Sequence, residues 1–218
     1  MAASEQAKRT IVRDCRFRSI GRVVQHKRAK ELISRYLSSS DLDLAWLSEQ
    51  SSALRDEIAD DDFDRSVLDN NADFVDRFIS RESKLVLPQA EFEWTPNPVF
   101  VMLNGVKVNT DILFKMQRTT KTNKLRVGGG AIRYRKDKPL SEEIALWQSA
   151  FIFGYLNSIN QDENVQSEEK LCITICAESG KPFPAPTDST KRFNNMKAAC
   201  ATIAERWENI EPPPSAKI

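Results

Sequence analysis

The sequence is poor in the residue types from which metal and redox sites are usually built. It has a single histidine, His26, and four cysteines that form no C-x-x-C pair: Cys15, Cys172, Cys176 and Cys200. A structural zinc site needs four sulfur or imidazole ligands at close spacing, so the sequence argues against zinc. Because side chains alternate along a strand, Cys172 and Cys176 fall on one face of an expected strand, where we expect buried, reduced thiols.

Long apolar runs are also missing. No stretch of about 18 apolar residues occurs, so we expect no membrane span. The first residues lack the apolar region of a secretory signal, and a cytoplasmic location is therefore expected. The three consecutive glycines at 128–130 match neither the dinucleotide-binding fingerprint nor a phosphate-binding loop. The 40% hydrophobic content of the 218 residues is nevertheless sufficient for a real core.

Charge is abundant but strongly segregated along the chain. The net charge is +1, yet residues 1–36 carry ten Lys/Arg against three acids (+7) and residues 41–82 carry four against thirteen (−9). Residues 104–138 carry ten against two (+8), and residues 139–218 carry seven against eleven (−4). Such blocks create local potentials that the net charge conceals. They predict either a surface for a charged partner or pairing between the blocks.

The N-terminal third has helical periodicity. Apolar residues recur at helical spacing over 20–37, Asp41 is placed to cap a second helix, and a third begins near Phe63 after the acidic run 60–62. We therefore expect a helical section over residues 1–85 with a frayed or extended start, an α+β core over 86–211 and a disordered tail over 212–218, all in one globular unit.

Residues 83–98 contain three prolines and are expected to be a connector, and the segment after them has strand signals. Asn104-Gly105 between apolar runs predicts a hairpin, and a looser turn near Asn123 leads to a third run through the three glycines. We expect a three-stranded antiparallel meander over residues 99–138, a core helix from about Glu142 and an acidic polar loop over 160–169. A fourth strand near 170–177, an edge segment at 182–186 and a last helix from Asp188 or Ser189 should follow. The prediction is the α+β class, with a mixed sheet flanked by helices.

The meander concentrates positive charge. A row of cations of this kind is typical of surfaces that bind the phosphate backbone of DNA or RNA, with an affinity that falls steeply with salt. Base stacking is expected to contribute little, since Tyr134 is the one aromatic residue among these cations. The candidate nucleic-acid-binding residues are Lys115, Arg118, Lys124, Arg126, Arg133, Arg135 and Lys136.

The expected order of elements over residues 63–207 is similar to the core of the PD-(D/E)XK nuclease-like superfamily. Asp111 fits that family's metal-binding aspartate, and Gln148 fits the glutamine of the helix that follows the meander. The glutamate position of the family's E-x-K motif is Ala131, and its lysine position is Arg133. The resemblance implies a restriction-endonuclease-like core and, if the site is catalytic, Mg²⁺ on Asp111 with Asp111 and Gln148 as catalytic residues.

These residues favour binding over cleavage. Mg²⁺ is held weakly by one carboxylate, and an arginine guanidinium stays protonated and is no base. The leading hypothesis is a non-catalytic, nucleic-acid-binding protein with a degenerate nuclease-like fold. One alternative is an interaction or assembly protein without nucleic acid, whose acidic and basic blocks pair within the chain or between copies, or with an acidic protein surface. The other is a Mg²⁺-dependent nuclease whose second acid has migrated, for example to Glu142 or Glu143.

Overall fold

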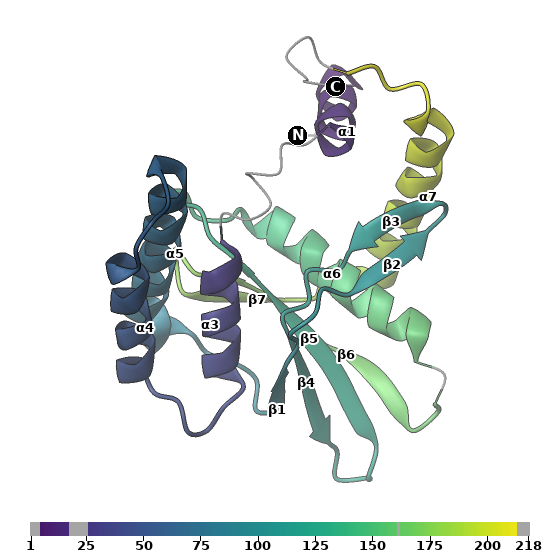
Figure 1. Cartoon of the computed structure of the whole chain (residues 1–218). Coiled ribbons are helices and arrows are strands. Elements are labelled where there is room, and N and C mark those ends of the chain that lie inside the picture. Colours follow the sequence, from purple (N-terminus) through teal and green to yellow (C-terminus); the bar gives the residue numbers. More distant parts are fainter. Residues whose placement is uncertain (1–4, 18–25, 161, 213–218) are drawn as a thin grey trace.

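The computed structural model describes residues 5–17, 26–160 and 162–212. Helices enclose a five-stranded mixed sheet, and a separate two-stranded hairpin lies to one side (Figure 1). The expected α+β class is confirmed. The helices are α1 (Glu5–Arg16), α3 (Lys27–Leu37), α4 (Leu44–Asp56), α5 (Asp62–Arg81), α6 (Glu142–Ile159) and α7 (Ser189–Trp207), with a 3-10 turn at Glu82–Lys84. The strands are β1 (Glu91–Trp94), β2 (Phe100–Leu103), β3 (Val106–Asn109), β4 (Phe114–Thr119), β5 (Leu125–Arg133), β6 (Val165–Cys176) and β7 (Lys181–Pro184).

The main sheet has the strand order β1-β4-β5-β6-β7. β1, β4 and β5 are antiparallel, β6 runs parallel to β5, and β7 is an antiparallel edge. A parallel neighbour requires a crossover connection, which α6 supplies between β5 and β6. The sheet is therefore mixed, as predicted.

The strands of the meander differ from those expected. Its first strand is β1, in a segment predicted to be a connector, and the Asn104-Gly105 hairpin forms the separate sheet β2–β3. The predicted middle strand breaks because Asp111 adopts a left-handed backbone, with φ +53°. The Asn109 side chain accepts a hydrogen bond from the Asp111 amide, which stabilises this turn. The chain thus leaves β3 and starts β4 in another sheet.

The core has two layers, one on each face of the main sheet. On one face, Ile33 of α3 and Phe74 and Phe78 of α5 pack with Phe114 and Ile132. On the other face, α6 packs on β5 and β6, for example through Ile152 against Ala131 and Cys172. Cys172 and Cys176 are buried, free thiols. The main sheet therefore packs against helices on both faces.

A bulge interrupts the pairing of β5 with β6. Val127 pairs with Ser167, but Gly129 pairs with Cys172, so β6 has extra residues opposite Gly128. A Cβ atom on Gly128 would lie 2.0 Å from the carbonyl oxygen of Leu171. Glycine at this position therefore allows the two backbones to approach closely.

Three further segments differ from or fall outside the sequence predictions. Residues 5–16 form α1 where a frayed or extended start was expected, and β6 begins at Val165, inside a predicted polar loop. The expected start of a helix at 19–25 and most of the expected disordered tail, 213–218, lie outside the described residues. Within the described ranges, no helix has the length and apolarity needed to cross a membrane.

Candidate functional site

Asp111, Arg133 and Gln148 lie together at one end of the main sheet, and Lys30 joins them. The Lys30 Nζ atom lies 3.1 and 3.0 Å from Asp111 Oδ1 and Oδ2. An Arg133 terminal nitrogen lies 2.9 Å from Asp111 Oδ2, and Arg133 Nε donates to Gln148 Oε1 at 2.6 Å. A single carboxylate therefore holds two cations, and one of these also binds the amide of α6.

Four different elements position this cluster. Lys30 is in the first turn of α3, which is fixed to α5 because the Ala29 amide donates to the buried Asn71 side chain at 2.8 Å. Arg133 is the last residue of β5, and Gln148 lies on α6. The left-handed turn that ends β3 directs Asp111 toward both cations.

Burial sets the electrostatics of the cluster. The side chains of Lys30 and Asp111 are each 19% exposed, whereas that of Arg133 is 43% exposed. Removal from water lowers the pKa of Lys30, and the neighbouring Asp111 carboxylate partly opposes that effect. One turn earlier, His26 lies edge-on to the rings of Phe74 and Tyr134, and burial followed by the charge of Lys30 lowers its pKa.

The residues around Asp111 bear directly on a metal site. Its two ion-pair partners in the described part of the chain are cations, and no group of three or more His, Cys, Asp or Glu side chains suited to a metal occurs there. Ala131, at the family's glutamate position, is fully buried. Of the two acids considered as migrated ligands, Glu142 pairs with Lys181 at 3.6 Å. Chemically, the cluster is a pair of cations, Lys30 and Arg133, that both bind one anion, the Asp111 carboxylate of the same chain.

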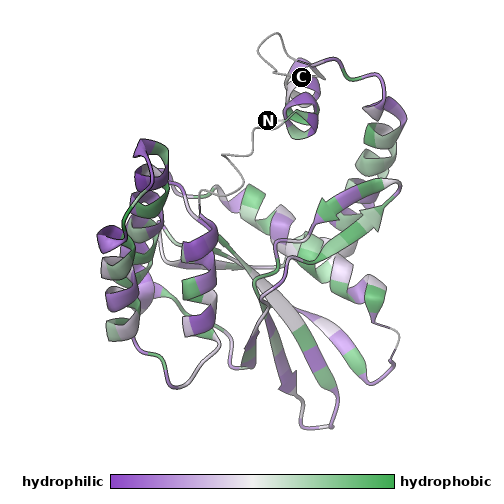
Figure 2. Cartoon of the chain, viewed as in Figure 1, coloured by the Kyte–Doolittle hydropathy of each residue, from purple (hydrophilic) through white to green (hydrophobic). Residues whose placement is uncertain are grey.

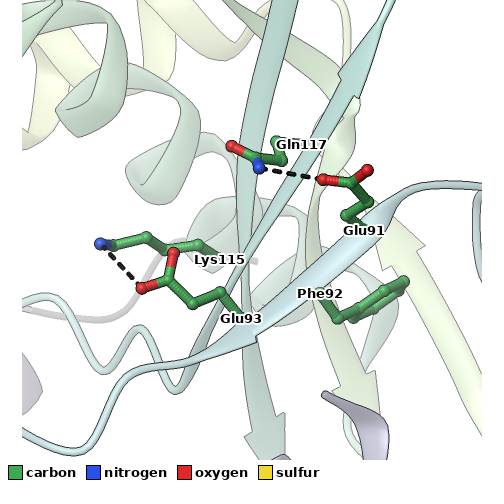
Figure 3. A pocket seen from close by; sticks show the side chains of 5 residues that line it. All are labelled: Glu91, Phe92, Glu93, Lys115 and Gln117. Carbon is green, nitrogen blue, oxygen red and sulfur yellow. Dashed lines mark hydrogen bonds and ion pairs between the residues drawn. The ribbon is translucent and has the colours of Figure 1, made fainter. Parts of the chain in front are cut away.

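Most of the cations predicted to bind phosphate are paired with acids of the same chain. Lys115 lies 3.9 Å from Glu93 of β1, as Figure 3 shows. Arg118 reaches across β5 to Glu168 of β6 at 2.5 Å. Counting Arg133 on Asp111 and Lys136, which lies 2.9 Å from Asp73 of α5, four of the seven have a carboxylate partner.

The other three cations have different surroundings. Arg126 donates to the neutral side chain of Gln166 on β6. Lys124 and Arg135 are exposed and have no ion-pair partner among the described residues. The turn that carries Lys124 lies beside the acidic segment before β6, because the Leu125 amide donates to the Asn164 carbonyl. That segment contains Asp162 and Glu163, so the local charge is mixed.

A shallow hollow lies on the exposed face of β1 and β4 (Figure 3). It measures about 180 Å³ and is lined by Glu91, Phe92, Glu93, Lys115 and Gln117. Gln117 donates to Glu91 at 3.1 Å, beside the Lys115–Glu93 pair. The polar side chains that line the hollow thus bind one another across β1 and β4.

Sequence reasoning found three of the four clustered residues but missed Lys30. Asp111, Arg133 and Gln148 came from the family resemblance, whereas Lys30 is 81 residues away from Asp111 in the sequence. The one available signal was its place in the basic block 1–36, which identifies no particular partner. The chain matches no protein-family model, and no curated protein sequence matches it significantly.

Proposed function

We propose that this protein is a non-catalytic interaction or assembly protein whose charged side chains chiefly hold its own layers together. The observation that carries the proposal is the pairing of the sheet cations with acids of the same chain. A cation held by a carboxylate must give up that partner before it can bind phosphate, which reduces the gain from a polyanion. This pairing favours the interaction hypothesis over the nucleic-acid hypothesis.

The cluster around Asp111 supports the same proposal. In a metal-dependent nuclease, the carboxylate at this position would have to be available to a divalent cation. Here the carboxylate accepts two charge-assisted hydrogen bonds from Lys30 and one contact from Arg133. Lys30 links α3 to the end of β3, and Arg133 links β5 to α6 through Gln148. The arrangement is suited to joining elements.

Exposed apolar side chains support binding to another protein. Ile58 and Phe63 lie at the connection between α4 and α5, and Phe100 and Met102 lie on β2; all four are well exposed. Contiguous exposed apolar surface marks contact sites, and each of these two segments exposes two large apolar side chains close together in the sequence. The protein therefore offers surfaces of mixed charge and apolar character to another protein.

Nucleic-acid binding is the second candidate, favoured by a specific set of residues. Lys121, Lys124, Arg135 and Lys138 are exposed and have no ion-pair partner among the residues that the structure covers. They lie at the two ends of the β4–β5 hairpin. A backbone long enough to span β5 would contact both pairs.

A binding titration separates the two candidates. Fluorescently labelled single- and double-stranded DNA and RNA oligonucleotides are titrated with the protein at about 50 mM and about 500 mM salt, and anisotropy is measured. We expect no salt-sensitive binding, because four of the seven candidate cations are already paired with acids of the same chain. Binding that is tight at low salt and lost in Lys124→Glu/Arg135→Glu, but retained in the control Lys191→Glu on α7, would establish the nucleic-acid candidate instead.

A further inference from the structure

The connection between α4 and α5 is an acidic tip that displays two apolar side chains. Residues 56–64 contain six acids and no base, and within them Ile58 is 93% exposed and Phe63 is 60% exposed. Glu57 pairs with Arg28, but Asp56, Asp60 and Asp62 have no cationic partner in the described part of the chain. We call residues 56–64 the acidic tip.

The acidic tip has a fixed conformation. The Arg65 guanidinium donates to the carbonyls of Leu54, Arg55 and Glu57, each at 3.0 Å. Asp61 caps α5 by accepting from the Asp64 amide at 2.7 Å. The apolar pair is therefore displayed on an ordered support, and a partner that binds it loses little conformational entropy.

The outer face of the β2–β3 hairpin has the complementary character. Phe100 is 48% exposed and Met102 is 62% exposed, and the Lys107 ammonium lies 4.5 Å from the centre of the Phe100 ring. Residues 100–109 contain Lys107 and no acid. The hairpin leads directly into Asp111, whose two cations leave that cluster with a net charge of +1. In Figure 2 the hairpin is coloured mostly as apolar.

The hairpin is also held in place. Its inner face packs on α6 and α7, where Leu103 lies with Phe151, Phe193 and Cys200. At its turn, Asn104 Nδ2 donates to the Lys197 carbonyl of α7 at 2.7 Å. Phe100 and Met102 alternate with the inner residues along β2, so they point away from this packing. We call Phe100, Met102 and Lys107 the hairpin face.

We infer that the acidic tip of one molecule docks on the hairpin face of a second copy of this chain. The two surfaces carry charge of opposite sign, and each displays two exposed apolar side chains. Figure 1 places the α4–α5 layer and the β2–β3 hairpin on opposite sides of the molecule, so they do not meet within one chain. Two different surfaces that bind each other form a head-to-tail contact, which extends into chains or closes into rings.

Two small apolar pairs bury little area, so each contact is weak and assembly depends on concentration. The inference deepens the proposed function by naming the partner, and it rests on that function. Sedimentation velocity over a concentration series measures the self-association. A salt concentration of about 50 mM is used because screening of charges is modest at that ionic strength. We expect the average mass to rise above the 24.8 kDa of one chain as concentration increases, and to fall back at high salt.

Variants at the acidic tip and at the hairpin face test the inferred contact directly. Ile58→Ser/Phe63→Ser and Phe100→Ser/Met102→Ser should each weaken association about tenfold or more, as loss of interface anchors does. Because all four side chains are exposed, the circular dichroism spectrum and unfolding midpoint should remain those of the wild type. The control Val86→Ser, at a position that is 79% exposed and outside both surfaces, should associate normally.

Mixing identifies the head-to-tail geometry. Each double variant retains one intact surface, so an equimolar mixture should form species of two chains that neither variant forms alone. A wild type that stays monomeric throughout the series, a double variant that associates as the wild type does, or a mixture that stays monomeric would overturn the inference. The oligonucleotide titration is independent of this result: absence of self-association with no polyanion binding removes this partner alone, whereas salt-sensitive polyanion binding removes the proposed function.

Discussion

At the scale of single residues, Asp111 combines two roles. Its backbone has the left-handed conformation that separates β3 from β4, and its carboxylate holds Lys30 and Arg133. Asparagine and aspartate tolerate this conformation better than most residues. The two roles can therefore be tested separately by removing the charge while the backbone preference is kept.

Asp111→Asn should lower the free energy of unfolding by roughly 1–3 kcal/mol, because Lys30 and Arg133 would then face each other without their shared anion. Chemical denaturation monitored by tryptophan fluorescence measures the change. The comparison variant is Lys30→Met, which keeps the aliphatic stem of the lysine. If the pair interacts as described, the double variant should lose less stability than the sum of the single variants. Additive losses would show that the ion pair contributes little.

At the scale of elements, β5 depends on glycine at particular positions. Gly128 faces the backbone of Leu171 at the bulge in β6, whereas a Cβ on Gly129 would lie no closer than 3.2 Å to another atom, the Cγ2 methyl group of Ile112. The two neighbours in sequence thus differ in what a methyl group would contact. This difference provides a matched pair of variants within one strand.

Gly128→Ala should destabilise the protein by about 3 kcal/mol or more, because the methyl group would force the β5 and β6 backbones apart. Gly129→Ala should cost less than about 1.5 kcal/mol, since a small shift of the Ile112 side chain would relieve the contact at 3.2 Å. Denaturant unfolding compares both variants with the wild type. Equal losses for the two variants would contradict the close backbone approach at the bulge.

The elements also show how far the sequence could predict the fold. The helices from α4 onward, the second half of β6 and the edge strand β7 follow local patterns, so they appear near their expected positions. The strands around Asp111 were assigned wrongly because a left-handed aspartate is stabilised by its neighbour Asn109 and by distant cations, which leave no local pattern. The candidate site was likewise only partly predictable from the sequence. The position of Lys30 depends on the packing of α3 against α5, which sequence spacing does not reveal.

At the scale of the whole molecule, ion pairs connect the helical layer to the sheet. Asp73 of α5 accepts from Arg55 of α4 at 3.0 Å and from Lys136, beyond β5, at 2.9 Å. The hydrogen bond from Lys136, and then that from Arg55, hold the pKa of Asp73 below its ordinary value of 3.8. The segregation of charge in the sequence is therefore used, at least in part, for contacts inside one molecule.

These ion pairs predict how stability depends on pH. Because the pKa of Asp73 is lower in the folded chain, the unfolded chain binds more protons as the pH falls below 3.8. The stabilisation from Asp73 is thus complete above that value and is lost as the pH falls through the folded pKa. Asp73→Asn should reduce stability near pH 7 and flatten the acid limb of a plot of unfolding midpoint against pH.

The matched control for this prediction is Asp69→Asn. Asp69 lies on the same helix and pairs with Arg65 within α5, at 3.0 Å. It joins no second layer, so its replacement should leave the acid limb close to that of the wild type. An unchanged acid limb in Asp73→Asn would show that the contact between the layers does not depend on this carboxylate.

The turn at the end of β3 also restricts how this protein can evolve. Its central position demands both a negative charge and tolerance of a left-handed backbone. Asparagine and glycine meet the backbone demand alone, and glutamate meets the charge demand alone, which leaves aspartate as the residue that satisfies both. In a selection from a saturation library for folded protein, this codon should accept fewer replacements than its immediate neighbours.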